Sequence, residues 1–216
     1  MPITPDYVIA SLIVIFFAIG LHEYAHAKVA DLSGDPTPRQ QGRVTLNLTK
    51  HFDLFGTIMI VMTTLTGFGI GWGKAVQVNP AKMHNPRWDW FASVMAGPLC
   101  NFVQAMAYAV VFRVVAPFVP NISESGFLFQ FLFLGVLINI SLMLFNLIPF
   151  GPLDGHWLVG LLLPEPVRLK WFQFNRTVGT PALLLLVLVG QVSNFSLLGL
   201  VLERPAIFLL RFLLGR

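Results

Sequence analysis

The 216-residue chain is poor in cysteine and in charged residues. Its one cysteine, Cys100, excludes an intrachain disulfide and any metal site built from several cysteines. Only 11% of the residues are Asp, Glu, Lys or Arg, well below the roughly 25% of soluble domains. The net charge of +4 does not indicate nucleic-acid binding, because no basic helix and no basic patch interleaved with aromatic residues is present.

The chain is instead rich in long apolar runs. Apolar residues make up 56% of the chain, and the mean hydropathy is +0.74. Runs over residues 7–30, 90–116, 127–149 and 178–202 each reach the roughly 20 residues that a helix needs to cross hydrocarbon. The sequence therefore predicts an α-helical, multi-pass integral membrane protein in the lipid bilayer, with residues 1–216 forming one polytopic helix-bundle domain.

Two segments alternate between apolar and polar residues, with the period of two that is typical of strands. They are residues 42–49 (GRVTLNLT) and 74–80 (KAVQVNP), and we expect them to form a small β element at the membrane surface. The run between them, 54–72, is short for a span. It ends in the glycine-rich stretch 67–73, which is poor helix material.

The basic residues predict how the chain is oriented. Seven of the fourteen Lys and Arg residues lie between residues 28 and 90, whereas residues 1–6 and 117–126 contain none. Since Lys and Arg are retained on the cytoplasmic side of a membrane, the 28–90 segment is expected to face the cytoplasm. The 54–72 run must then enter the membrane and return on the same side, as a re-entrant segment buried against protein.

The first apolar run carries His22-Glu23-Tyr24-Ala25-His26, an HExxH motif. Residues four apart share one helix face, so His22 and His26 can bind one metal ion. Imidazole suits zinc, and two imidazoles leave room for a third ligand and water, from which Glu23 can take a proton. Such residues are costly inside a membrane span, which favours a functional site over a hydrogen-bonded cluster between helices.

A third ligand must come from further along the chain. The downstream candidates are Asp154, His156, Glu165 and Glu203. Asp154 follows Pro149 and Pro152, which break the helix and let the chain turn inward. Because two histidines and one carboxylate form a common catalytic zinc set, Asp154 is favoured over its rival His156.

The number of membrane crossings also favours Asp154. If the 54–72 run does not cross, the chain leaves the cytoplasmic side at 90–116 and returns at 127–149. Asp154 then arrives on the same side as the HExxH motif.

Three asparagines, Asn101, Asn139 and Asn146, lie in or beside these helices. Each can bond a substrate backbone, an oxyanion or another helix, and Asn101 and Asn146 are the candidates for substrate or oxyanion contact.

Taken together, these motifs resemble those of the site-2 protease family of intramembrane metalloproteases, in its compact bacterial and archaeal form. HEYAH is similar to the HExxH of that family, and PLDG at 152–155 resembles its Asp-Gly motif. GPLCN at 97–101 resembles its Gly-x-x-x-Asn motif, and GWGKAVQVNP at 71–80 resembles its GWAKPVPVNP stretch. The chain departs from the family at scaffold positions, where Leu48, Ala75 and Gln77 replace prolines.

The resemblance implies one Zn²⁺ per chain, held by His22, His26 and Asp154, with Glu23 as general base. It implies hydrolysis of peptide bonds in or near transmembrane segments of membrane-protein substrates, as in regulated intramembrane proteolysis. The expected location is a prokaryotic cell membrane, with the active site toward the cytoplasm and a transmembrane protein as partner. The alternative function is a non-proteolytic membrane protein that binds or transports zinc.

Overall fold

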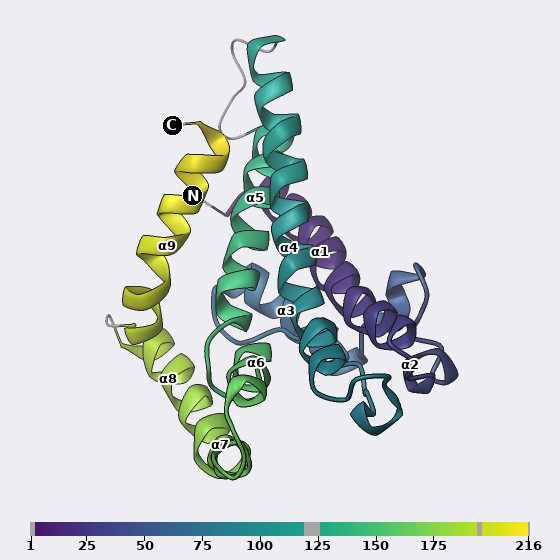
Figure 1. Ribbon diagram of the computed structural model, residues 1–216. Helices are drawn as coiled ribbons and strands as arrows, with labels where there is room; N and C mark the ends of the chain where they lie inside the picture. The colour runs from purple at the N-terminus through teal and green to yellow at the C-terminus, as the bar shows by residue number, and fades with distance from the viewer. Residues whose placement is uncertain (1–2, 119–125, 194–195, 216) are drawn as a thin grey trace.

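The computed structural model describes residues 3–118, 126–193 and 196–215, which are helical or irregular (Figure 1). In chain order the α-helices are α1 (Pro5–Leu32), α2 (Thr37–Gln40), α3 (Leu54–Thr66), α4 (Trp88–Val115), α5 (Phe127–Asn146), α6 (Asp154–Leu162), α7 (Val167–Phe174), α8 (Thr180–Val192) and α9 (Leu197–Leu214). Short 3₁₀ turns lie at Leu48–His51, Pro80–Lys82 and Ala116–Phe118, and Asn175–Gly179 forms a π-helical turn between α7 and α8.

Helices α1, α4 and α5 pack against one another and form the centre of the bundle (Figure 1). The buried face of α1 carries small residues, among them Ala10, Ala18 and Ala27, which let the neighbouring helices approach closely. The Asn101 amide of α4 donates to the Ala18 carbonyl of α1 across this contact. The close packing brings polar side chains of three helices within hydrogen-bonding reach of one another.

Among the described residues, four helical stretches are long and apolar enough to cross a membrane: Pro5–Leu32, Trp88–Phe118, Phe127–Asn146 and Val167–Val192. The prediction of a multi-pass helical membrane protein is therefore confirmed. The fourth stretch ends earlier than the predicted 178–202 run. A new helix, α9, begins at Leu197, because the Ser196 hydroxyl accepts from the Gly199 N–H and caps it.

The predicted small β element is wrong, since the residues that the structure describes contain no strand. Within 42–49 the chain turns locally: the Thr45 N–H donates to the Arg43 carbonyl, and the Asn47 N–H donates to the Thr45 hydroxyl. Side-chain hydroxyls and amides that bond nearby backbone compete with a strand ladder. The alternation does not match burial either, since polar Arg43 is buried while apolar Leu46 is exposed.

The 74–80 segment is extended but pairs with no strand in the described part of the chain, because its backbone groups bond elsewhere. The Val76 N–H donates to the Glu23 carboxylate at 3.1 Å, and the Asn79 N–H donates to the Asp35 carboxylate at 2.6 Å. The Lys74 N–H donates to the His51 carbonyl at 2.8 Å. Three separate parts of the protein thus take the donors that a neighbouring strand would need.

The 54–72 run, predicted to be re-entrant, consists of helix α3 and an irregular segment after it. The 13-residue α3 begins with Asp53, whose carboxylate accepts from the Gly56 N–H, and ends at Gly67 in the left-handed conformation, with a φ of 71°. The chain then runs back along α3, where a Cβ atom at Gly71 would lie 2.4 Å from the Ile60 side chain. Because Lys74 bonds to His51, the segment returns to the end at which it started.

Candidate metal centre

His22 and His26 lie one turn apart on α1, on the face toward α4 and α5. Asp154 is the first residue of α6, the helix that follows α5 after a short loop. Helix α4 leads away from the end of the bundle that holds α2, α6 and α7, and α5 leads back to it (Figure 1). The structure therefore brings Asp154 to the histidines by the path that the count of crossings predicts.

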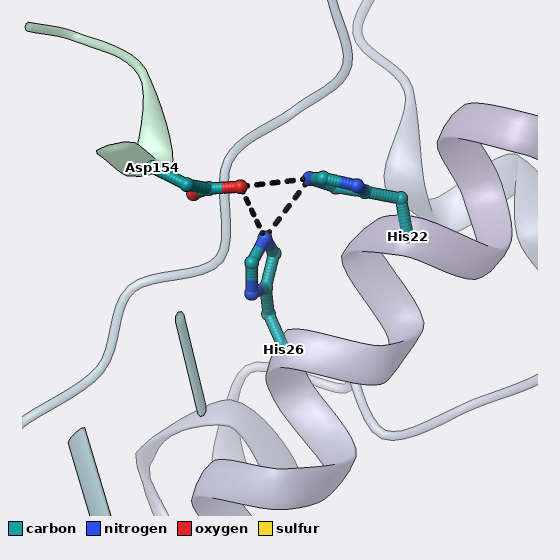
Figure 2. A group of neighbouring side chains, drawn as sticks. All are labelled: His22, His26 and Asp154. Atoms are coloured by element: carbon teal, nitrogen blue, oxygen red, sulfur yellow. Dashed lines mark hydrogen bonds and ion pairs between the residues drawn. The ribbon is translucent and has the colours of Figure 1, made fainter. Parts of the chain in front are cut away.

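The three side chains converge on one point (Figure 2). Asp154 Oδ2 lies 3.3 Å from His22 Nε2 and 3.3 Å from His26 Nε2, and the two Nε2 atoms are 3.0 Å apart. Ligands about 2.0–2.1 Å from a tetrahedral zinc ion stand roughly 3.3 Å from one another. The spacing of the three atoms therefore fits three corners of a zinc coordination tetrahedron.

Hydrogen bonds orient both imidazole rings with Nε2 toward this point. His22 Nδ1 donates to Asn101 Oδ1 at 2.6 Å, and His26 Nδ1 donates to the Ser93 carbonyl at 2.8 Å. Asp154 Oδ2 is buried and has no hydrogen-bond donor among the described residues. Three lone-pair atoms that face each other this closely need a positive charge between them, and a metal ion supplies it. The residues present thus fit a metal ion.

The loop before α6 aims the Asp154 carboxylate. The Asn175 side chain accepts from the Gly151 N–H at 2.8 Å, which ties the loop to the turn before α8. At the first position of α6, a carboxylate is also stabilised by the helix dipole. The loop and the helix end together therefore hold the Asp154 carboxylate at the metal centre.

The other predicted ligand candidates lie apart from this cluster. His156 turns away: its Nδ1 is 2.5 Å from the Leu153 carbonyl, and its ring centroid is 4.2 Å from that of Trp157. Glu165 pairs with Arg168, and Glu203 is an exposed residue of α9. Among the described residues, only His22, His26 and Asp154 form a cluster of potential metal ligands.

One face of α4 is shaped to fit the histidines. Ser93, Gly97 and Asn101 lie four residues apart and are all buried. A Cβ atom at Gly97 would lie 2.3 Å from His26 Nε2 and 2.6 Å from His22 Cε1, so only glycine fits there. The Gly-x-x-x-Asn spacing in the sequence signals Gly97 and Asn101. Ser93 was missed, because it binds His26 through a backbone carbonyl, which carries no residue-specific signal.

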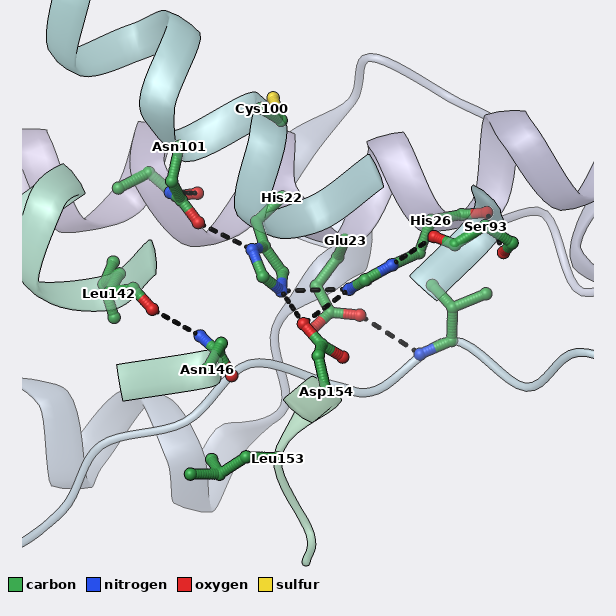
Figure 3. Close-up of polar contacts among 12 residues, drawn as sticks. His22, Glu23, His26, Ser93, Cys100, Asn101, Leu142, Asn146, Leu153 and Asp154 are labelled. Carbon is green, nitrogen blue, oxygen red and sulfur yellow. Dashed lines mark hydrogen bonds and ion pairs between the residues drawn. The ribbon is translucent and has the colours of Figure 1, made fainter. Parts of the chain in front are cut away.

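Glu23 lies beside the ligands and borders a cavity of about 480 Å³, whose lining also includes His22, Asn146 and residues 70–73. One of its carboxylate oxygens, Oε2, accepts from the Val76 N–H of the extended segment (Figure 3). The side chain is 13% exposed. The Glu23 carboxylate and the His22 imidazole therefore lie side by side at the wall of a mainly apolar cavity, with His26 and Asp154 behind His22.

The two predicted amide candidates have different surroundings. Asn101 accepts from His22 and donates both amide hydrogens, to the Ala18 carbonyl and to Asn139 Oδ1, so it holds the ring of His22 in place. Asn146 lines the cavity and donates one amide hydrogen to the Leu142 carbonyl at 2.9 Å (Figure 3). Only Asn146 retains an amide hydrogen for a bound molecule.

Fold and site together define a multi-pass helical membrane protein of the metalloprotease class. A model of Peptidase family M50 matches residues 114–190. A Bacillus subtilis (strain 168) protein named "Putative zinc metalloprotease YwhC" is 37% identical over 175 residues, which cover 77% of this chain and 74% of that protein. No solved structure matches the chain significantly. The chain belongs to peptidase family M50, the family of the site-2 proteases.

Proposed function

We propose that this protein is an intramembrane zinc metalloprotease that hydrolyses peptide bonds in or near transmembrane segments of other membrane proteins. The observation that carries the proposal is the convergence of His22, His26 and Asp154 beside Glu23, within a bundle of membrane-spanning helices. Two imidazoles and one carboxylate suit Zn²⁺, the metal in the name of the B. subtilis relative. Regulated intramembrane proteolysis is the process that such an activity would serve.

Each residue of the site has a role in this reaction. Zinc, when bound, supplies a Lewis acid that polarises the scissile carbonyl and makes water more acidic. Glu23 takes a proton from the attacking water and passes it to the leaving amine. Asn146, with one amide hydrogen to spare, is our candidate for holding the carbonyl oxygen as negative charge develops on it. Asn101 keeps the His22 ring in its metal-binding orientation.

The apolar lining of the cavity favours a membrane-embedded substrate. Its lining includes Ile19, Leu142 and Leu184 from three helices, together with the extended residues 70–73. A transmembrane helix that enters it must unwind locally, because its carbonyls are otherwise held in intrahelical bonds. We place the site toward the cytoplasm, since the basic residues cluster between residues 28 and 90.

The test is cleavage of a single-span model substrate by purified protein in liposomes, with zinc measured by mass spectrometry. We compare the wild type with Glu23→Gln and with Glu203→Gln, a matched loss of one carboxylate on the exposed side of α9. We expect the wild type and Glu203→Gln to cleave. Glu23→Gln should retain zinc and lose activity, because it keeps the ligands but removes the base.

Other outcomes would contradict parts of the proposal. Absence of zinc from the wild type would overturn the metal centre. Zinc in all three proteins with cleavage by none, across several single-span substrates, would favour the alternative of a zinc-binding or zinc-transporting protein. Cleavage by Glu23→Gln at the wild-type rate would show that another group is the base.

A further inference from the structure

Arg43 is a buried arginine close to the proposed catalytic base. It is 4% exposed, and its Nη2 lies 4.0 Å from Glu23 Oε2. Nη2 also donates a hydrogen bond to the Lys74 carbonyl, while Nε has no acceptor among the described residues. Burying a guanidinium costs several kcal/mol of desolvation free energy unless the group is paired. The burial of Arg43 therefore needs an explanation from its contacts.

The contacts of Arg43 hold a piece of backbone against Glu23. Residues 73–76 contact both side chains: Arg43 donates to the Lys74 carbonyl, and the Val76 N–H donates to Glu23 Oε2. Gly73 lies so close to α1 that a Cβ atom there would fall 2.5 Å from Ile19 Cγ2 and 3.5 Å from Glu23 Cγ. The His51 carbonyl accepts from the Lys74 N–H and holds the segment from the other side.

The two carboxylate oxygens of Glu23 differ in their hydrogen bonding. Oε2 faces the Val76 N–H and the Arg43 charge, whereas Oε1 makes no hydrogen bond within the part of the chain that the structure describes. A carboxylate that is fixed through one oxygen presents the other in one direction. A base that is oriented before the reaction gains most of its catalytic advantage from that orientation.

We propose that Arg43 is a positioning residue for Glu23: it fixes the 73–76 backbone and attracts Oε2, which leaves Oε1 free to handle protons at the metal centre. The inference rests on the proposed function and adds to it a residue outside the metal ligands and the HExxH motif. Arg43 is neither a metal ligand nor one of the residues that line the cavity, and Glu23 is the cavity residue that it faces, so its effect passes through Glu23.

The chain offers a matched control four residues away. Arg39 carries the same charge but is exposed, and its guanidinium pairs with Asp31 at 2.6 and 2.8 Å on the surface. Arg39→Gln therefore removes one positive charge from the neighbouring helix α2 without removing a contact of Glu23. Arg43→Lys keeps a positive charge at the site but lacks the planar fork of the guanidinium.

The experiment measures kcat, KM and zinc content for the wild type, Arg43→Gln, Arg43→Lys and Arg39→Gln in liposomes with a single-span substrate. The visible spectrum of the Co²⁺-substituted proteins reports the geometry of the metal centre. We expect Arg43→Gln to lower kcat by roughly tenfold to a hundredfold, the usual effect of losing a residue that supports a metal site. Its KM, zinc content and cobalt spectrum should match the wild type.

Arg43→Lys should recover part of the lost kcat, and Arg39→Gln should equal the wild type. An unchanged kcat in Arg43→Gln, or a change confined to KM or to the cobalt spectrum, would overturn the positioning role. If Arg43→Gln does not fold, the kcat of Arg43→Lys decides: a value equal to wild type rejects the proposal. Failure of the wild type itself to show Glu23-dependent cleavage would instead reject the proposed function, and this inference with it.

Discussion

Gly97 of α4 lies directly against the ring of His26, and a Cβ atom on residue 97 would fall 2.3 Å from His26 Nε2. The backbone of one helix thereby forms a wall of the metal centre on another.

Gly97→Ala is therefore expected to displace both imidazoles and to abolish zinc binding and cleavage. Gly190→Ala is the control, because its nearest neighbour, the Ser196 hydroxyl at 3.1 Å, belongs to the cap of α9 and not to the metal centre. Zinc content by mass spectrometry checks both variants. Retention of a full equivalent of zinc by Gly97→Ala would contradict the close contact.

Asn101→Ala tests whether this amide orients His22. Loss of a hydrogen bond that orients a metal-binding histidine typically lowers metal affinity or activity by roughly tenfold to a hundredfold. We expect weaker zinc binding in competition titrations, whereas Gln104→Ala, one turn further along α4, should bind as the wild type. Unchanged zinc affinity with a lower kcat would instead indicate that Asn101 acts on the substrate.

Metal removal should destabilise the protein. A metal at a hundredfold its dissociation constant stabilises the folded state by about 2.7 kcal/mol, or roughly 5–10 °C in Tm for a chain of this size. A zinc chelator should lower the Tm of the wild type and of His156→Ala by this amount. Asp154→Ala, which cannot hold the metal, should not respond. The reverse pattern for these two variants would make His156 the third ligand.

The buried, hydrogen-bonded carboxylate of Asp35 should make the stability of the folded protein depend on pH. This residue is buried, and its carboxylate accepts from the Thr37 and Asn79 N–H groups at 3.0 and 2.6 Å. Burial alone would raise the pKa of Asp35, but these hydrogen bonds lower it below the ordinary value. A lowered pKa stabilises the folded state above the unfolded-state pKa of about 3.9, and the gain is lost as pH falls through the folded-state pKa.

Asp35→Asn should accordingly lower the free energy of unfolding at pH 7 by about 1–3 kcal/mol, because one of the two acceptor oxygens is replaced by an N–H₂ group. Below the folded-state pKa, where the wild-type carboxyl is protonated, the two proteins should have similar stability. Thermal unfolding at both pH values provides the measurement. A difference that is equally large in acid would show that the contribution does not depend on charge.

The membrane helices and the pairing of the two metal-binding histidines could be predicted from local features of the sequence, and the count of membrane crossings favoured Asp154 as the third ligand. Span length follows from the number of consecutive apolar residues. The pairing of His22 with His26 follows from helix periodicity, which places residues four apart on one face. The glycine at 97 and the amide at 101 were also visible as a motif, although their contacts were not.

The 42–49 and 74–80 segments show where such reasoning fails. Their alternation predicted strands, and the extended conformation of the second is present without any pairing. Its donors go to Glu23, Asp35 and the His51 carbonyl, each of them on a different part of the chain. A period of two favours a strand, but in this protein it identifies neither the buried side chains nor the partners of the backbone.

The sequence by itself determined that this is a helical membrane protein with an HExxH motif, since composition and helix periodicity act over short distances. Only the tertiary structure decided that Asp154 and not His156 faces the histidines, that Asn101 supports His22, and that Arg43 lies behind Glu23. These relationships join residues far apart in the chain. They depend on helix packing and on which buried polar group finds which partner, and no local pattern encodes that choice.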